Sequence, residues 1–233
     1  IRRQRQMCIR DSVDIVLEDE KAFIALKEAL TALGYKALGG EISKTDMKLN
    51  PSEIFVKENR PRVDLFVGLI CNAFYLSDSM RKRCEIREIG NLKLRIMSNE
   101  DIFLLKSITD REGDIYDMIE LAKSRGFNWR TVFEELHVQE EIAKRHFCRS
   151  LLDSVEIVEK KTNIRAPFYS KLVNHCIDQA IIESVEKWKA TTLKQIKEFI
   201  DYPDYKLRSR INRLIKEGKL VASKDGRFAM PQL

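Results

Sequence analysis

Two acidic residues lie inside otherwise apolar stretches and are the first candidates for chemistry. Asp14 lies in the run Val-Asp-Ile-Val, and Asp64 lies in the run Val-Asp-Leu-Phe. A carboxylate without a partner is costly to bury, so each aspartate requires a partner, an exposed strand face or a metal ion. Neighbouring strands could bring both carboxylates to one Mg²⁺, which takes oxygen ligands and keeps positions open for phosphates. The alternative for each aspartate is an exposed place on an edge strand.

The elements that would position these aspartates form a small α/β region. Residues 13–17 and 62–67 are β-type runs, and residues 53–56 form a weaker one. Apolar residues at helical spacing predict a helix after the first run, with its C-cap at Gly34. Residues 83–96 alternate apolar and polar side chains around a Gly-Asn turn, and this pattern predicts a hairpin.

Helices are expected throughout the middle of the chain. Ser98 begins a good N-cap sequence, and apolar residues at helical spacing continue from there to about Lys187. The pattern is interrupted near Gly113, residues 126–128 and residues 164–167. We therefore expect several consecutive helices.

The last segment shows a characteristic order of elements. Residues 193–200 are a predicted helix capped by Thr192, and residues 205–217 are a second one. Two short strand-like runs then flank a turn at residues 224–227. Helix, turn, helix and β-hairpin in this order are typical of a winged helix, a variant of the helix-turn-helix motif.

Basic side chains on the second helix and the wing are candidate contacts to RNA or DNA, because Lys and Arg on such elements bind phosphates. These residues are Lys206, Arg208, Arg210, Arg213, Lys224 and Arg227. The alternative is that the module binds protein or packs on the rest of the chain, with Arg210 and Arg213 simply solvated.

Several of these segments together resemble a minimal nucleotidyltransferase. They are residues 13–16, the helix that ends at Gly34, residues 62–65, residues 99–106 (Asn-Glu-Asp-Ile-Phe-Leu-Leu-Lys) and residues 110–117 (Asp-Arg-Glu-Gly-Asp-Ile-Tyr-Asp). Their order and spacing are similar to the polymerase-β-type superfamily, which includes nucleotidyltransferase toxins of abortive-infection toxin–antitoxin systems. The resemblance covers about half of the chain, from residue 13 to about residue 125.

The resemblance implies a set of site residues and a reaction. Asp14 and Asp64 would be the second and third of three carboxylates that hold two Mg²⁺ ions and the nucleoside triphosphate (NTP). Lys106 would approach the phosphates, and Asp114 and Asp117 would match an acidic pair that supports the site and helps to position the lysine. The implied reaction is in-line transfer of a nucleotide from an NTP to a hydroxyl acceptor, with RNA as one candidate acceptor.

The same residues also have plainer interpretations. Lys106 could be a solvated helix lysine, and Asp114 and Asp117 could be helix-surface acids that pair with Arg111 or Lys123. The rival to an enzyme is a non-catalytic nucleic-acid-binding regulator or antitoxin-like protein that uses the winged helix. A third possibility is a structural adaptor. For a toxin-like protein, the resemblance adds a cognate antitoxin as a partner.

The chain departs from this family at the position of the first carboxylate. Ser12 stands there, and no Gly-Ser loop precedes it. A hydroxyl is a poor substitute for an anionic Mg²⁺ ligand, so we expect an incomplete active site and an impaired enzyme as the chain is written. Residues 1–12 resemble a translated adapter sequence, and we expect them to be a non-native leader that replaces the true start.

The sequence therefore predicts an α+β protein. After the leader, residues 13–97 would form a small mixed-sheet core like that of the nucleotidyltransferases. Residues 98–187 would form a helical region, and residues 188–233 would form a winged-helix domain.

Composition and charge limit the class of protein further. The 233 residues are 44% hydrophobic, which is enough for a core. No apolar run reaches the roughly 18 residues that span a bilayer, so we expect a cytoplasmic protein without a membrane partner. Five cysteines without a Cys-x-x-Cys pair argue against a disulfide framework or zinc ribbon. Of the net charge of +6, residues 186–233 alone carry +6, which places any polyanion contact at that end of the chain.

Overall fold

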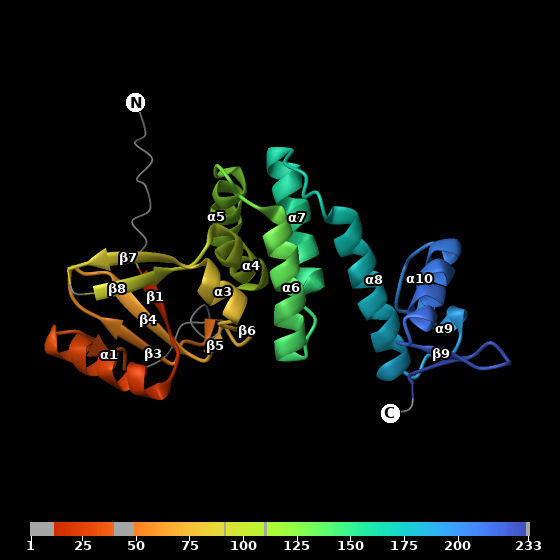
Figure 1. The fold of residues 1–233 in the computed structure, drawn as a ribbon, viewed down its shortest axis with the longest axis horizontal. Helices are drawn as coiled ribbons and strands as arrows, with labels where there is room; N and C mark the ends of the chain where they lie inside the picture. Colours follow the sequence, from red (N-terminus) through yellow and green to blue (C-terminus); the bar gives the residue numbers. More distant parts are fainter. Residues whose placement is uncertain (1–11, 40–48, 91, 110, 232–233) are drawn as a thin grey trace. The chain divides into compact units, whose positions relative to one another are not determined.

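The structure is a computed structural model that describes residues 12–39, 49–90, 92–109 and 111–231 (Figure 1). It combines helices with small sheets, which confirms the expected α+β class. The chain forms two compact units. Unit 1 consists of Ile1–Phe127 with Glu134–Arg145, and unit 2 consists of Asn128–Phe133 with His146–Leu233.

A four-stranded sheet with strand order β1-β4-β3-β2 is the centre of unit 1. Strand β1 (Ser12–Leu17) runs parallel to β4 (Arg62–Val67), as a βαβ crossover requires. Strand β3 (Glu53–Val56) is antiparallel to β4, and β2 (Lys36–Ala37) is antiparallel to β3. Strands β1, β3 and β4 were expected from the sequence, whereas the two-residue β2 was too short to give a pattern.

Helix α1 (Glu20–Ala32) covers one face of this sheet. It begins because the side chain of Asp19 accepts a hydrogen bond from the backbone N–H of Ala22 at 2.7 Å. It ends before Gly34, whose φ of +83° is the left-handed conformation that favours glycine at this position. Apolar side chains of the helix and of alternate strand positions form the core between them, with Leu30, Phe55, Val63 and Leu65 buried.

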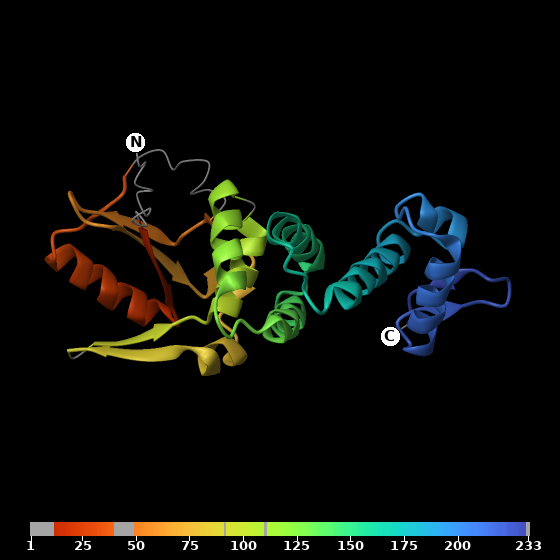
Figure 2. The same cartoon turned by 90° about the horizontal axis from the view of Figure 1, so that it is seen from above.

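Short elements and helices complete unit 1. A predicted hairpin is confirmed as β7 (Glu85–Ile89) paired with β8 (Leu92–Ile96), and Figure 2 shows it as an extended two-stranded ribbon. Three elements were not predicted: β5 (Leu69–Ile70), β6 (Phe74–Tyr75) and α3 (Asp78–Arg83). The helices that follow are α4 (Asn99–Thr109), α5 (Glu112–Lys123) and α6 (Trp129–Ala143), the last of which contributes residues to both units.

A buried polar network fixes α3 to α4 and α6. The guanidinium group of Arg83 lies 2.5 Å from a carboxylate oxygen of Asp101 and 2.5 Å from one of Glu135. Glu135 also accepts hydrogen bonds from Ser77 and Gln139 at 2.7 and 2.8 Å. Both carboxylates are almost fully buried, so these partners replace the water that folding removes.

Unit 2 is helical and ends in a small hairpin. Its helices are α7 (Cys148–Thr162), α8 (Tyr169–Glu186), α9 (Leu193–Lys197) and α10 (Asp204–Lys216), followed by β9 (Val221–Ala222) and β10 (Phe228–Ala229). Side chains from α8, α9 and α10 share one core, in which Ile181, Ile196 and Leu207 are fully buried.

The order of elements in residues 191–229 agrees with the prediction. Thr192 and Gln195 form a capping box at the start of α9, and Gly218 follows α10 with a φ of +71°. The backbone N–H of Phe228 donates to the carbonyl of Thr191 at 2.8 Å, which ties the hairpin to the start of α9. Among the described residues, no helix has both the length and the apolar character that crossing a membrane requires.

Candidate metal and nucleotide site

Asp14 and Asp64 are direct register partners in the parallel pair of β1 and β4. Partners in neighbouring strands project to the same face of a sheet, and side chains alternate between faces along each strand. The flanking residues Ile15 and Leu65 pack in the core beneath α1. The two aspartates therefore share the face opposite to α1.

Asp64 is buried, and Arg62 on the same strand neutralises it. The Nε and Nη2 atoms of Arg62 donate hydrogen bonds to the two carboxylate oxygens of Asp64, at 2.6 and 2.8 Å. Such a two-point contact is the strong geometry for an arginine and a carboxylate. It explains how Asp64 can be only 1% exposed.

Asp14 lies beside this pair in a different environment. Its side chain is exposed, and it has no hydrogen bond or ion pair with another described residue. Many protein atoms nevertheless surround it, and this loss of hydration raises the pKa of Asp14 above its ordinary value of 3.8. The negative charge of Asp64 raises the pKa further, against the opposing effect of Arg111, Lys106 and Arg62.

Lys106 of α4 is held by both acids of the predicted pair on α5. Its Nζ lies 2.6 Å from Asp114 and 2.7 Å from Asp117. Lys106 is only 14% exposed, so it is not the freely solvated lysine of the plainer interpretation. The positive charge of Lys106 lowers the pKa of Asp14, against the stronger effects that raise it.

Asp114 is the centre of this cluster. It accepts hydrogen bonds from Thr109 and from Arg111, whose Nε lies at 2.6 Å. Burial alone would raise the pKa of Asp114, but the hydrogen bonds from Arg111, Lys106 and Thr109 outweigh it, and the pKa is lowered. The carboxylate therefore stays ionised and anchors two cations next to Asp14.

Arg111 and Cys71 also belong to this region, although the sequence gave no reason to place them in a site. Burial raises the pKa of the Cys71 thiol to about 11, and the negative charge of Asp14 contributes to the shift. Cys71 and Asn72 both have positive φ angles, of 52° and 55°. Arg145 supports this turn by donating to the carbonyl of Asn72 at 2.9 Å. The turn follows β5, which is too short to leave a sequence signal.

The residues present provide suitable donors for Mg²⁺, with one position unfilled. Asp14 offers free carboxylate oxygens, and an ionised carboxylate has about four acceptor sites, so Asp64 retains capacity beyond its bonds to Arg62. Ser12 lies two residues before Asp14 and therefore on the same face of β1. The segment that would carry the Gly-Ser loop, and nearly all of the expected leader, lie outside the described residues.

The six basic candidates of unit 2 fall into two groups. Lys206, Arg208 and Lys224 are exposed. The other three form ion pairs: Arg210 with Asp178, Arg213 with Glu217, and Arg227 with Asp225. Arg210 is only 13% exposed and binds Asp178 on α8, so it is neither solvated nor presented on the outer face of α10.

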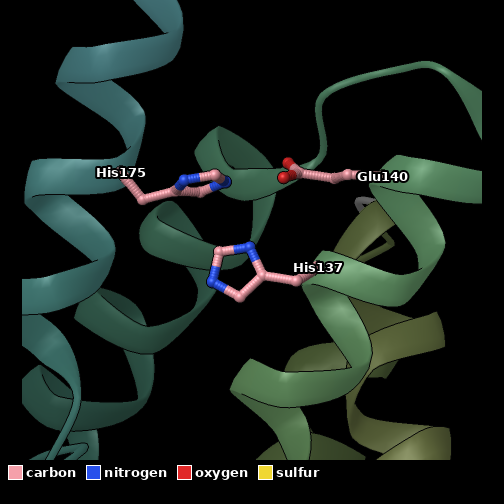
Figure 3. Close-up of side chains that lie close together, drawn as sticks. All are labelled: His137, Glu140 and His175. Atoms are coloured by element: carbon pink, nitrogen blue, oxygen red, sulfur yellow. The ribbon is translucent and has the colours of Figure 1, made fainter. Parts of the chain in front are cut away.

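The structure also draws attention to two histidines. From the sequence, the His175-Cys176 pair is a candidate source of zinc ligands without the spacing of a standard site, whereas His137 is not singled out. Figure 3 shows His137 and Glu140 on neighbouring turns of α6, with His175 carried by α8. The His-x-x-Glu spacing on a predicted helix is the signal that could have identified the first two. Within unit 1 these two residues supply fewer than the three protein ligands that even an open zinc site uses.

Comparisons with known proteins leave the family of this chain open. No family model matches the sequence, and neither a curated protein nor a solved structure is similar to it.

Proposed function

We propose that unit 1 is a Mg²⁺-dependent nucleotidyltransferase site that transfers a nucleotide from an NTP to a hydroxyl acceptor. The observation that carries the proposal is the register of Asp14 and Asp64, which puts the exposed carboxylate of Asp14 beside the buried carboxylate of Asp64 on one face of the sheet. The raised pKa of Asp14 supports it: loss of hydration is its main cause and the charge of Asp64 the second, and a bound divalent cation would offset both. A clustered set of perturbed titratable groups is also a frequent mark of a functional site.

Each side chain of the cluster has a role in this proposal. Asp14 and Asp64 would hold the metal, and Arg62 fixes the orientation of Asp64 through its two hydrogen bonds. Bound Mg²⁺ supplies charge neutralisation at the phosphates and activation of the attacking oxygen. Asp114 and Asp117 hold the ammonium group of Lys106 at 2.6 and 2.7 Å, which agrees with the positioning role that the resemblance gives to this acidic pair.

The unfilled position suggests a gain-of-function experiment. Ser12→Asp would add a third carboxylate on the face of β1 that carries Asp14, because residues two apart on a strand share a face. We expect this variant to bind a Mg²⁺–NTP complex more tightly than the wild type, by calorimetry. We also expect it to transfer label from an α-phosphate-labelled NTP to RNA.

Ser12→Asn is the matched control, because it has a similar size and no charge. Ser12→Asp combined with Asp14→Asn should lose the gained binding. If Ser12→Asp binds Mg²⁺–NTP no better than Ser12→Asn, the proposed site is wrong.

A second candidate function is binding of duplex nucleic acid by unit 2. The observation that favours it is the exposure of Lys206 and Arg208 on α10 and of Lys224 between β9 and β10. In a winged helix these elements contact the groove and backbone of a duplex. Arg208→Ala and Lys224→Ala should then weaken duplex binding and reduce its salt dependence, in a titration at several salt concentrations. Unchanged binding in both variants would contradict this function.

A further inference from the structure

A groove of about 460 Å³ lies in unit 2 between α8 and α10, which run beside each other (Figure 1). It is lined by Tyr169 and Asn174 from α8, by Tyr202 from the turn before α10, and by Lys206, Ser209 and Arg210 from α10 itself. Its volume lies in the range of about 300–1,000 Å³ that is usual for ligand sites. A splayed-out nucleotide would fit in it, whereas a duplex would not.

The two tyrosines give the groove its aromatic character. Both are half-buried, so neighbouring atoms restrain their rings while part of each ring remains accessible. The Tyr169 hydroxyl is already engaged, because it donates to Glu156 at 2.8 Å. A ligand in the groove would therefore contact the ring of Tyr169 rather than its hydroxyl. Accessible aromatic rings of this kind are stacking platforms for bases of any sequence.

A cation accompanies each tyrosine. Lys206 Nζ lies 5.2 Å from the centre of the Tyr202 ring, and the guanidinium carbon of Arg165 lies 5.4 Å from the centre of the Tyr169 ring. Asp178 neutralises Arg210, so Lys206 is the cation of the groove lining that remains for a phosphate. A base that stacks at the edge of the groove could therefore place its neighbouring phosphate on Lys206.

Polar side chains complete the groove. The side chains of Asn174 and Ser209 make no hydrogen bond with another described residue. An amide and a hydroxyl in this position can both donate to and accept from a base edge or a sugar.

We propose that the α8–α10 groove of unit 2 binds single-stranded nucleic acid, with bases against Tyr169 and Tyr202 and a phosphate on Lys206. This groove shares Lys206 with the α10 surface that would contact a duplex, but Tyr169, Tyr202 and Asn174 belong to the groove, whereas Arg208 and Lys224 do not line it. The proposal does not depend on nucleotidyl transfer by unit 1.

The test is fluorescence anisotropy with the whole chain and a labelled ten-nucleotide oligouridine, at several salt concentrations. We expect Tyr169→Ala and Tyr202→Ala each to weaken binding by about fivefold or more, the usual loss of one stacked base. Lys206→Ala should reduce the salt slope by about one phosphate contact. Tyr205→Ala is the matched control, because Tyr205 is an exposed tyrosine of α10 that does not line the groove.

Two further variants guard against loss of folding. Tyr202 also packs against the core of unit 2, so Tyr202→Phe keeps the ring and should retain binding. Asn174→Asp adds a negative charge to the groove without removing any packing, and it should weaken binding.

Three results would overturn the proposal. The first is the absence of oligouridine binding by the wild type. The second is an equal loss in Tyr205→Ala and Tyr202→Ala. The third is competition by polyglutamate as effective as that by unlabelled oligouridine, which would indicate an acidic protein partner. Tighter binding of a duplex, lost in Lys224→Ala, would favour the second candidate function instead.

Discussion

At the scale of single residues, two aspartates on one face have opposite environments. Asp64 is buried and paired with Arg62, whereas Asp14 is exposed and has no partner among the described residues. Evolutionary optimisation for stability alone would favour a neutral side chain at position 14, since its negative charge faces that of Asp64. A destabilising charge at an exposed position is typical of a binding or catalytic group.

This argument predicts that Asp14→Asn stabilises the protein at neutral pH. The pKa of Asp14 is raised in the folded state, so the folded protein binds more protons than the unfolded chain above the ordinary pKa of 3.8. The penalty is therefore absent below that pH, develops as the pH rises through the folded pKa, and is complete at pH 7. For an exposed side chain we expect a gain of about 0.5 kcal/mol, or a rise in Tm of about 1–2 °C.

Thermal unfolding of both proteins at pH 7 and near pH 3.5 checks the sign. The difference in Tm should be present at pH 7 and disappear near pH 3.5. At neutral pH, added Mg²⁺ should raise the Tm of the wild type more than that of Asp14→Asn. A lower Tm for Asp14→Asn at pH 7 would contradict the repulsion between the two aspartates.

At the scale of elements, α3 is held in unit 1 by charge as well as by packing. Arg83, at the end of α3, is the shared cation of Asp101 on α4 and Glu135 on α6. Hydrogen bonds to both carboxylates raise the pKa of Arg83 despite its partial burial. Burial alone would raise the pKa of Glu135, but the hydrogen bonds that its carboxylate accepts lower it. One arginine thus joins three helices.

Removing that arginine should be strongly destabilising. Arg83→Met leaves two buried carboxylates without their cation, and breaking such a group costs about 3–5 kcal/mol. Arg81→Met, which removes an exposed ion pair of the same helix with Asp78, should cost at most about 1 kcal/mol. Urea unfolding of both variants checks this difference. Similar losses for the two would show that the buried network contributes little.

The same elements show what a sequence can predict. Strands β1 and β4 and the cap at Thr192 were predicted because alternation and capping are local properties. Helix α3 was missed because its six residues, mostly charged, give no apolar period. The partner of Arg210 was not foreseeable either, because Asp178 lies on another helix and only the packing of α8 on α10 brings the two together.

The candidate site was predictable to a similar extent. Asp14 and Asp64 stood out as acids within apolar runs, and the resemblance added Lys106, Asp114 and Asp117, but which of them meet in space depends on strand register and helix packing. Register follows from which faces are buried, and that is a property of the whole sheet.

At the scale of the whole molecule, each unit has its own core and its own candidate site. Leu30, Phe55 and Leu65 belong to a core of unit 1, and Ile181, Ile196 and Leu207 belong to the core of unit 2. The aspartates lie in unit 1, and the basic α10 lies in unit 2. On the two proposals above, a metal–nucleotide complex and a nucleic-acid strand would bind through separate residues.

Because the two proposed sites use different residues, a single substitution should abolish one binding function and leave the other intact. In the Ser12→Asp background, Asp14→Asn should abolish the gain in Mg²⁺–NTP binding and leave oligouridine affinity unchanged within about twofold. Lys206→Ala should do the reverse, because Lys206 belongs to unit 2 and is not part of the proposed metal site of unit 1. Calorimetry with Mg²⁺–NTP and anisotropy with oligouridine, on the same preparations, measure both. If either substitution changes both affinities, the two sites are coupled, and the nucleic-acid strand bound by unit 2 becomes the first acceptor to test for nucleotide transfer by unit 1.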